Sequence, residues 1–164
     1  MKHVTKLLAI FALIGSLLLC ACTASPKTFT KDGMSITLTN RFSEIKQENF
    51  LTGYGSTNAA VLVTKEAFTL FEGTTLGKSS TLTDYANAVI TAQKLADGTE
   101  VKTNDGVTYF NYESSVDGVT YKYMATVHKS EDAFWMIQFS AKAADYADME
   151  ADFFTYAKSI TFAK

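Results

Sequence analysis

Residues 107–128 read VTYFNYESSVDGVTYKYMATVH, two segments rich in apolar and aromatic residues on either side of Asp117-Gly118. Asp-Gly between such segments is among the strongest short signals of a β-hairpin, because a two-residue type I′ turn needs positive φ at both positions. The facing pairs that this turn produces are Val116 with Val119, Tyr112 with Tyr123, Phe110 with Ala125 and Glu113 with Lys122. Aromatic and opposite-charge pairs each stabilise a sheet by about 0.2–1 kcal/mol. The stretch therefore predicts two long antiparallel strands.

Two further Asp-Gly pairs predict tight turns in the same way. They join 29–31 to 34–38 through Asp32-Gly33, and 100–104 to 107–115 through Asp105-Gly106. Additional strands are expected at 60–64 and 133–141. In the latter, Trp135, Ile137 and Phe139 alternate with Phe134 and Met136, so large apolar side chains stand on both sides of the strand. The sheet is therefore expected to be covered on both faces.

Two helices are expected to supply that cover. Thr-x-x-Asp at 81–84 resembles a capping box, and apolar residues then recur at helical spacing as far as Ile90. Gly98 is expected to end this helix. A second helix is expected to begin near Asp145, with an extended segment at 159–162. The apolar stripe of the second helix is Tyr146, Met149, Phe153, Ala157 and Ile160.

The N-terminal 21 residues have the pattern of a cleavable signal peptide. Lys2 and Lys6 precede an apolar run at 7–19 that is shorter than the roughly 20 residues needed to span a bilayer. The run ends in Leu-Cys-Ala-Cys at 19–22, which resembles the lipobox of bacterial lipoproteins. Cys22 is therefore expected to carry a diacylglyceryl group. The alternative is an ordinary secreted protein that is cleaved near Ala21 and keeps a free thiol.

The cysteines and the N-terminal pattern together predict the organisation of the chain. Cys20 and Cys22 are the only cysteines, so a mature chain that starts at Cys22 contains no disulfide. We expect a signal peptide at 1–21, a lipidated N-terminus with a short tether at 22–27, and a single domain at 28–164. The diacylglycerol would hold this domain at the extracytoplasmic face of the cell membrane. In a bacterium with two membranes, the outer membrane is the alternative location.

Composition restricts the function further. The chain contains 12 Phe, 8 Tyr and 1 Trp, which suits a packed core and argues against disorder. Two of its 15 basic residues precede the cleavage site, whereas all 17 acidic residues follow it. The mature chain is therefore mildly acidic and lacks the basic patch that nucleic acid requires, so a nucleic-acid partner is not expected.

Several features occur together between residues 28 and 162. They are Phe29 followed by Asp32-Gly33-Met34-Ser35-Ile36, the helix opening Thr83-Asp84-Tyr85-Ala86, the long aromatic hairpins, and the ending Phe153…Lys158-Ser159-Ile160-Thr161-Phe162. Together they resemble the PsbP-like superfamily, and within it the small bacterial lipoproteins grouped with DcrB. The resemblance implies an α/β/α sandwich, in which one mostly antiparallel sheet of about six strands is covered by helices. It also implies a non-catalytic accessory or assembly role. Photosynthetic members act at a manganese cluster, but this chain has no matching ligand set.

Several short motifs partly resemble catalytic or metal sites. GTTLGKS at 73–79 is one residue shorter than a phosphate-binding loop, and Ser-Glu-Ile-Lys at 43–46 lacks the partner motifs of penicillin-recognising enzymes. His128, the only histidine after cleavage, cannot form the usual zinc set alone. Acidic residues at 145–152 are favoured at a helix N-terminus, with weak calcium binding as the alternative. No catalytic residue, cofactor or metal is therefore expected.

A candidate ligand surface remains. The glycine- and hydroxyl-rich loop 53–57 could form it together with Tyr54, Tyr109, Tyr121 and Tyr123, although packing in the core is the alternative for these tyrosines. The leading hypothesis is a non-catalytic, lipid-anchored accessory or binding protein of the cell envelope. Its partner would be another envelope protein or a small ligand. The alternatives are an envelope hydrolase with an unrecognised site and a purely structural surface protein.

Overall fold

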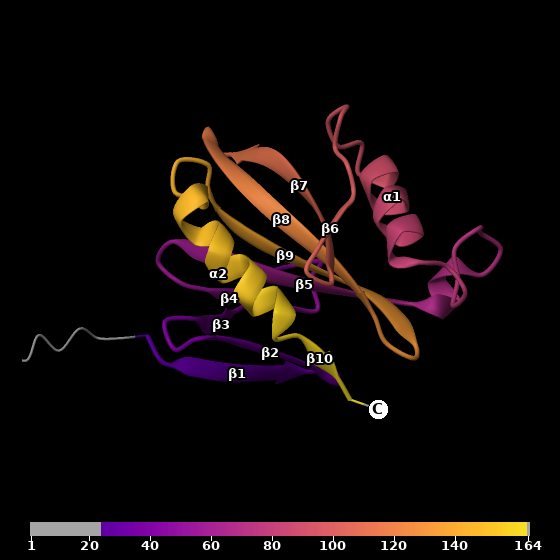
Figure 1. Ribbon diagram of the computed structural model, residues 1–164, viewed down its shortest axis with the longest axis horizontal. Coiled ribbons are helices and arrows are strands. Elements are labelled where there is room, and N and C mark those ends of the chain that lie inside the picture. Colours follow the sequence, from indigo (N-terminus) through magenta and orange to yellow (C-terminus); the bar gives the residue numbers. More distant parts are fainter. Residues whose placement is uncertain (1–23, 164) are drawn as a thin grey trace, which may run out of the picture.

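The computed structural model describes residues 24–163, which form two antiparallel sheets and two α-helices (Figure 1). In spatial order, the main sheet consists of β3 (Ser43–Ile45), β4 (Thr52–Gly55), β5 (Ala59–Ala67), β9 (Ala133–Lys142), β8 (Val119–Lys129), β7 (Val107–Val116) and β6 (Lys102–Asn104). The second sheet consists of β1 (Pro26–Lys31), β2 (Met34–Thr39) and β10 (Thr161–Phe162), with β2 in the centre.

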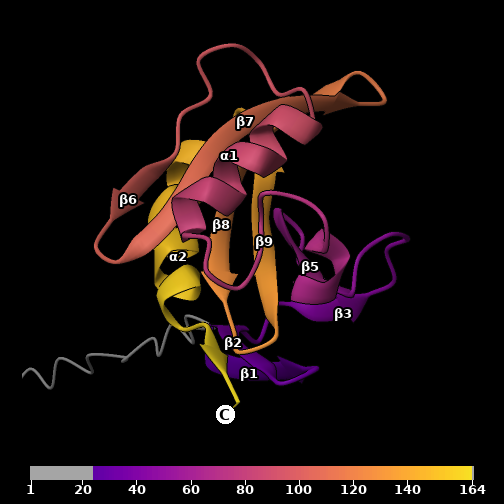
Figure 2. The ribbon, with the colours of Figure 1, turned by 90° about the vertical axis from the view of Figure 1, so that its right-hand side faces the viewer.

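The two faces of the main sheet carry separate apolar cores. Helix α1 (Leu82–Ala92) packs on one face, where Tyr85, Ala86 and Val89 are buried (Figure 2). Helix α2 (Tyr146–Lys158) covers the other face together with the second sheet. A short 3-10 helix, η1 (Phe68–Phe71), follows β5. The expected α/β/α sandwich is therefore confirmed.

The register of the central hairpin is the one that the sequence predicts. Tyr112 lies opposite Tyr123 and Glu113 lies opposite Lys122, and the two tyrosine rings stack 4.7 Å apart. Asp117 and Gly118 have φ values of 50° and 78°, as a type I′ turn requires. The turns at 32–33 and 105–106 also have positive φ at both positions and join the expected strands.

The main sheet has seven strands rather than about six, because the chain forms two short strands that the sequence did not predict. These are β3 and β4, and β4 takes up part of the segment 53–57 that was read as a loop. The glycines of β4 weaken the sequence signal for a strand, because glycine is a weak strand former. At Gly53 a Cβ atom would lie 3.1 Å from side-chain atoms of Ile45 and Leu62, so the close packing favours glycine there.

Helix α1 begins as expected and ends earlier than expected. Thr81 and Asp84 form a complete capping box, in which the Thr81 side chain accepts from the Asp84 backbone N–H. The helix ends through Lys94, whose φ is 52°, with the N–H of Leu95 donating to the carbonyl of Ile90 at 3.2 Å. This is a Schellman arrangement with lysine in the left-handed position. The expectation that Gly98 ends the helix was therefore wrong, and Gly98 lies in the following turn.

Glycine substitutions test the turn that sets the central register. Gly118→Ala is expected to lower the free energy of unfolding by about 1 kcal/mol, because alanine is strained at a φ of 78°. Gly77→Ala is the matched control, because a Cβ at Gly77 meets nothing within 4 Å and its φ lies outside the left-handed region. Chemical denaturation of both variants measures the difference. Equal effects would contradict the assigned turn.

Candidate functional site

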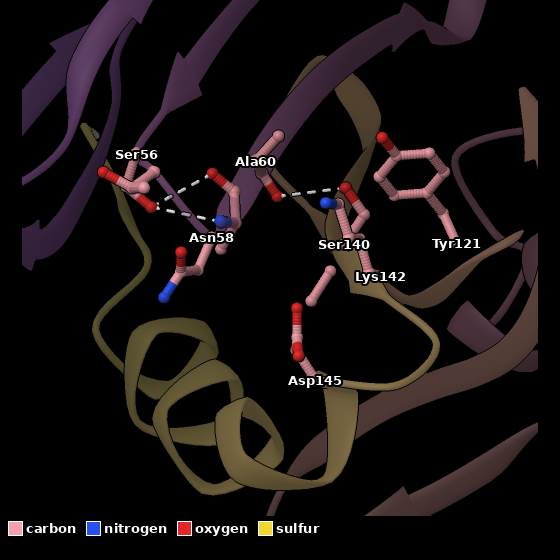
Figure 3. A pocket seen from close by; sticks show the side chains of 10 residues that line it. Ser56, Asn58, Ala60, Tyr121, Ser140, Lys142 and Asp145 are labelled. Carbon is pink, nitrogen blue, oxygen red and sulfur yellow. Dashed lines mark hydrogen bonds between the residues drawn. The ribbon is translucent and has the colours of Figure 1, made fainter. Parts of the chain in front are cut away.

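Two hollows meet at the end of the main sheet where β4 turns into β5. They share Ser56, Thr57 and Asn58 as a common wall. The smaller hollow has a volume of about 230 Å³ and is also lined by Ala60, Tyr121, Ser140, Lys142 and Asp145 (Figure 3). The larger has a volume of about 610 Å³ and is also lined by Ala24, Thr39, Arg41, Phe42, Met149, Asp152 and Tyr156. Both hollows are open to solvent at the same end of the molecule.

The shared wall is held by its own hydrogen bonds. The Ser56 hydroxyl accepts from the backbone N–H of Ala59 at 3.2 Å and lies 3.2 Å from the Ala59 carbonyl. The Ser140 hydroxyl donates to the carbonyl of Ala60 at 3.4 Å. Both serine hydroxyls are therefore engaged with backbone groups, and neither contacts a histidine. Thr57 and Asn58 are exposed and remain accessible to a ligand.

Charges of both signs lie around the hollows. In the larger one, burial raises the pKa of Tyr156, and the nearby Asp152 raises it further, while Thr39 and Arg41 act in the opposite direction. The phenol therefore stays protonated at neutral pH. Lys142 and Asp145 are exposed at the smaller hollow. These groups can hold a polar ligand by hydrogen bonds and ion pairs.

Only two of the four tyrosines in the expected ligand surface face this region. Tyr121 lines the smaller hollow beside the shared wall, as the sequence hypothesis required. Tyr123 lies two residues further along β8, on the same face of the sheet, and lines a neighbouring shallow groove together with Tyr121. Both side chains are half-buried. The structure therefore brings these two residues together at one surface.

Tyr54 and Tyr109 lie on the opposite face of the main sheet. Tyr54 is 2% exposed and packs against Phe29 with ring centroids 4.6 Å apart. Tyr109 makes an edge-to-face contact with Phe154 of α2 at 5.1 Å. Alternation along the strands directs these two side chains into the α2 core, so the structure separates them from Tyr121 and Tyr123.

Sequence reasoning did not assign the other residues of the smaller hollow to a ligand surface, and it considered Asp145 only as part of the acidic residues at 145–152. Ser140 stands in a strand that is otherwise almost entirely apolar, and this departure from the pattern is the one signal that could have identified it. Lys142, Asp145 and Asn58 reach the hollow only because β9 ends, α2 begins and the β4–β5 turn lies at the same edge. Their positions depend on tertiary structure, and no local pattern marks them.

His128 lines neither hollow. Its Nε2 lies 3.0 Å from the Thr126 hydroxyl, which itself donates to the carbonyl of Ile137 at 3.1 Å. We therefore assign Nε2 as the donor to Thr126. Burial lowers the pKa of His128 to about 4. The half-buried ring packs near Phe162 and serves as a structural group.

Some predictions fall outside the structure or find no counterpart in it. Cys22 lies outside the described residues, as does the signal peptide. Within residues 24–163 no helix is long and apolar enough to cross a membrane. The same part of the chain contains no group of three His, Cys, Asp or Glu residues that could hold a metal ion.

Comparisons with known proteins identify the fold. No protein-family model and no curated protein matches the sequence. Among solved structures, the chain is similar to cyanobacterial PsbP (CyanoP) from Synechocystis sp. PCC 6803, with a TM-score of 0.57, 16% identity, and coverage of 85% of this chain and 94% of that one. A crystal structure from Bacteroides thetaiotaomicron gives a TM-score of 0.56 at 9% identity, covering 84% of this chain. This chain spans only 48% of the Bacteroides protein.

A third solved structure is LpqN, involved in cell envelope biogenesis of Mycobacterium tuberculosis, with a TM-score of 0.48 and 11% identity. It is covered over 86% of its length, and the match spans 87% of this chain. The match covers nearly the whole length of CyanoP, and this similarity establishes that the fold is PsbP-like.

The half-buried histidine predicts how stability depends on pH. Its pKa falls from 6.5 in the unfolded chain to about 4 in the folded one, so the unfolded state binds the extra proton first. The contribution of neutral His128 to the free energy of unfolding is complete above pH 6.5. As the pH falls towards 4, the free energy of unfolding decreases by about 3 kcal/mol. His128→Gln should keep the hydrogen bond to Thr126 and remove this dependence. Urea denaturation at pH 7 and pH 4 measures how much the free energy of unfolding changes between the two pH values. The same change in wild type and His128→Gln would refute the assignment.

Proposed function

We propose that the protein is an extracytoplasmic lipoprotein of the DcrB-like group, anchored to the cell membrane through a diacylglyceryl group on Cys22. Its folded domain would act as a non-catalytic accessory module. The lipobox-like Leu-Cys-Ala-Cys at 19–22 supports the anchor, and the PsbP-like fold is consistent with the group. In a bacterium with two membranes, the outer membrane is the alternative location.

The lipobox-like sequence carries the proposed anchor, and the position of Ala24 sets the orientation that the anchor would give the domain. Ala24 lines the larger hollow and stands two residues after Cys22 in the sequence. Consecutive Cα atoms are 3.8 Å apart, so the Cα atoms of these two residues can be separated by at most about 7 Å. A lipid on Cys22 therefore places the hollowed end of the domain next to the bilayer.

The same end also presents exposed apolar side chains. The backbone N–H of Ala143, just before α2, donates to the carbonyl of Thr120 at 2.9 Å, which joins the β7–β8 hairpin tip to this region. Val116 and Val119 at that tip are 51% and 39% exposed. Exposed apolar residues beside hydrogen-bonding hollows are typical of a surface that contacts another protein. We infer that the partner is an envelope protein that lies close to the membrane.

Cys22→Ala tests the anchor. The variant cannot receive the lipid, so it is expected to move from the membrane fraction to the periplasm or medium when the cells are fractionated. Cys20→Ala is the matched control and is expected to stay in the membrane. Retention of Cys22→Ala in the membrane would exclude the proposed attachment.

A photo-crosslinking amino acid at Asn58 tests the proposed contact surface. Asn58 is exposed between the two hollows. Glu131 is exposed at the other end of β9, a strand whose ten residues span roughly 30 Å. Illumination of intact cells is expected to give a discrete adduct from position 58 and none from position 131. Mass spectrometry then identifies the partner, and the same adducts from both positions would contradict a partner at the hollowed end.

A further inference from the structure

A separate groove opens on the α1 face of the main sheet, away from the hollowed end. Helix α1 packs over β7 and β8, while parts of β5 and β9 remain uncovered beside its C-terminal end (Figure 2). Thr64, Glu66, Met136 and Gln138 form the floor of the groove, and Val89 and Phe50 form its walls. Its volume is about 450 Å³, within the range of roughly 300–1,000 Å³ that is usual for small-molecule sites.

Glu66 is the only charged side chain in the lining of this groove. Its carboxylate accepts a hydrogen bond from the Tyr85 hydroxyl. The ion pairs found in residues 24–163 are Lys65 with Asp132 and Lys158 with Asp105, so neither includes Glu66. Burial and Glu66 both raise the pKa of Tyr85, so the phenol stays protonated and can donate its hydrogen bond to Glu66.

The C-terminal end of α1 adds negative potential at the same place. Ala92 and Gln93, the last helical residue and the C-cap, both line the groove. The carbonyl end of a helix dipole is negative, and the last turn of α1 contains no basic residue to offset it. Lys94 follows in the chain, but it is exposed and is not part of the lining. A carboxylate and a helix C-terminus therefore face one groove, which favours a positively charged ligand.

The rest of the groove combines polar side chains with an apolar patch formed by Val89, Met136 and Phe50. Val89 and Met136 are only 9% and 5% exposed, although both line the groove. The Tyr112 hydroxyl donates to the side-chain carbonyl of Gln138, and the Tyr112 ring stacks on Tyr123. The floor is thus fixed before a ligand arrives, which lowers the entropy cost of binding.

We propose that this groove binds a small organic cation, with an ammonium group on Glu66 and an apolar body against Val89 and Met136. The carboxylate supplies a charge-assisted hydrogen bond. Contact with Val89 and Met136 favours an amine that also carries an apolar body. The proposal does not depend on the lipid anchor or on the hollowed end. It assigns a second, separate binding site to the domain.

Titration with 2-phenylethylammonium at pH 7 tests the site. The purified full chain in a non-ionic detergent is expected to show saturable NMR shifts of the Val89 and Met136 methyl groups. The neutral isostere 2-phenylethanol should bind much more weakly, because it cannot form the ion pair. Nα-acetyl-lysine amide carries an ammonium group without the aryl body. Binding of this compound as tight as that of the arylamine would assign the groove to protein lysines and overturn the proposal.

Variants separate the charge from the fold. Glu66→Gln is expected to weaken the amine roughly tenfold or more, the loss typical of a hydrogen bond to a charged group. Tyr85→Phe keeps the carboxylate and removes only its hydrogen-bond donor, so it should retain binding even if Glu66→Gln is poorly folded. Glu100→Gln, an exposed carboxylate just before β6, is the matched control and should bind like the wild type. Equal affinity of wild type and Glu66→Gln, loss of binding in Tyr85→Phe while it remains folded, or no shift of the two methyl groups would overturn the proposal.

Discussion

The structure depends on the register of the β7–β8 hairpin. Asp117-Gly118 is a two-residue turn with positive φ at both positions, so it fixes which residues of β7 and β8 face each other. Because side chains alternate along a strand, that register also decides which of them enter the α1 core and which enter the α2 core. Phe110 and Ala125 belong to one core, whereas Met124, one residue away, belongs to the other. A shift of one residue would exchange these two sets and bury the wrong side chains.

Elements marked by local chemistry could be predicted from the sequence, and elements set by distant partners could not. The Asp-Gly turns and the Thr81 capping box need only a few neighbouring residues, and the structure reproduces them. The pairing of β10 with β2 joins residues more than a hundred positions apart and leaves no local trace. Lys94 ends α1 in a left-handed conformation that glycine adopts far more often than other residues. The sequence pattern therefore pointed to Gly98, and not to Lys94, as the residue that ends the helix.

The binding surfaces show the same division. Loop 53–57 and Tyr121 were chosen for their composition, and they do meet at the smaller hollow. Tyr54 was chosen for the same reason, yet its place opposite Val61 turns it into the α2 core. Glu66 drew no attention because one acidic residue near the end of a strand is ordinary in a sequence. Its role depends on the hydrogen bond from Tyr85, which lies on a helix that begins sixteen residues later and packs over the sheet.

Strand β2 separates the two ends of the domain. Its residue Thr39 pairs with Pro26, where the described chain enters the fold, and its residue Met34 pairs with Phe162, where the chain leaves it. Five residue steps along an antiparallel strand span roughly 17 Å. In the proposed lipoprotein, with its lipid on Cys22, the chain would enter beside the bilayer and would exit on the side that points away from it. A reporter or affinity tag added at the C-terminus would therefore project into the extracytoplasmic space and leave the hollowed end free.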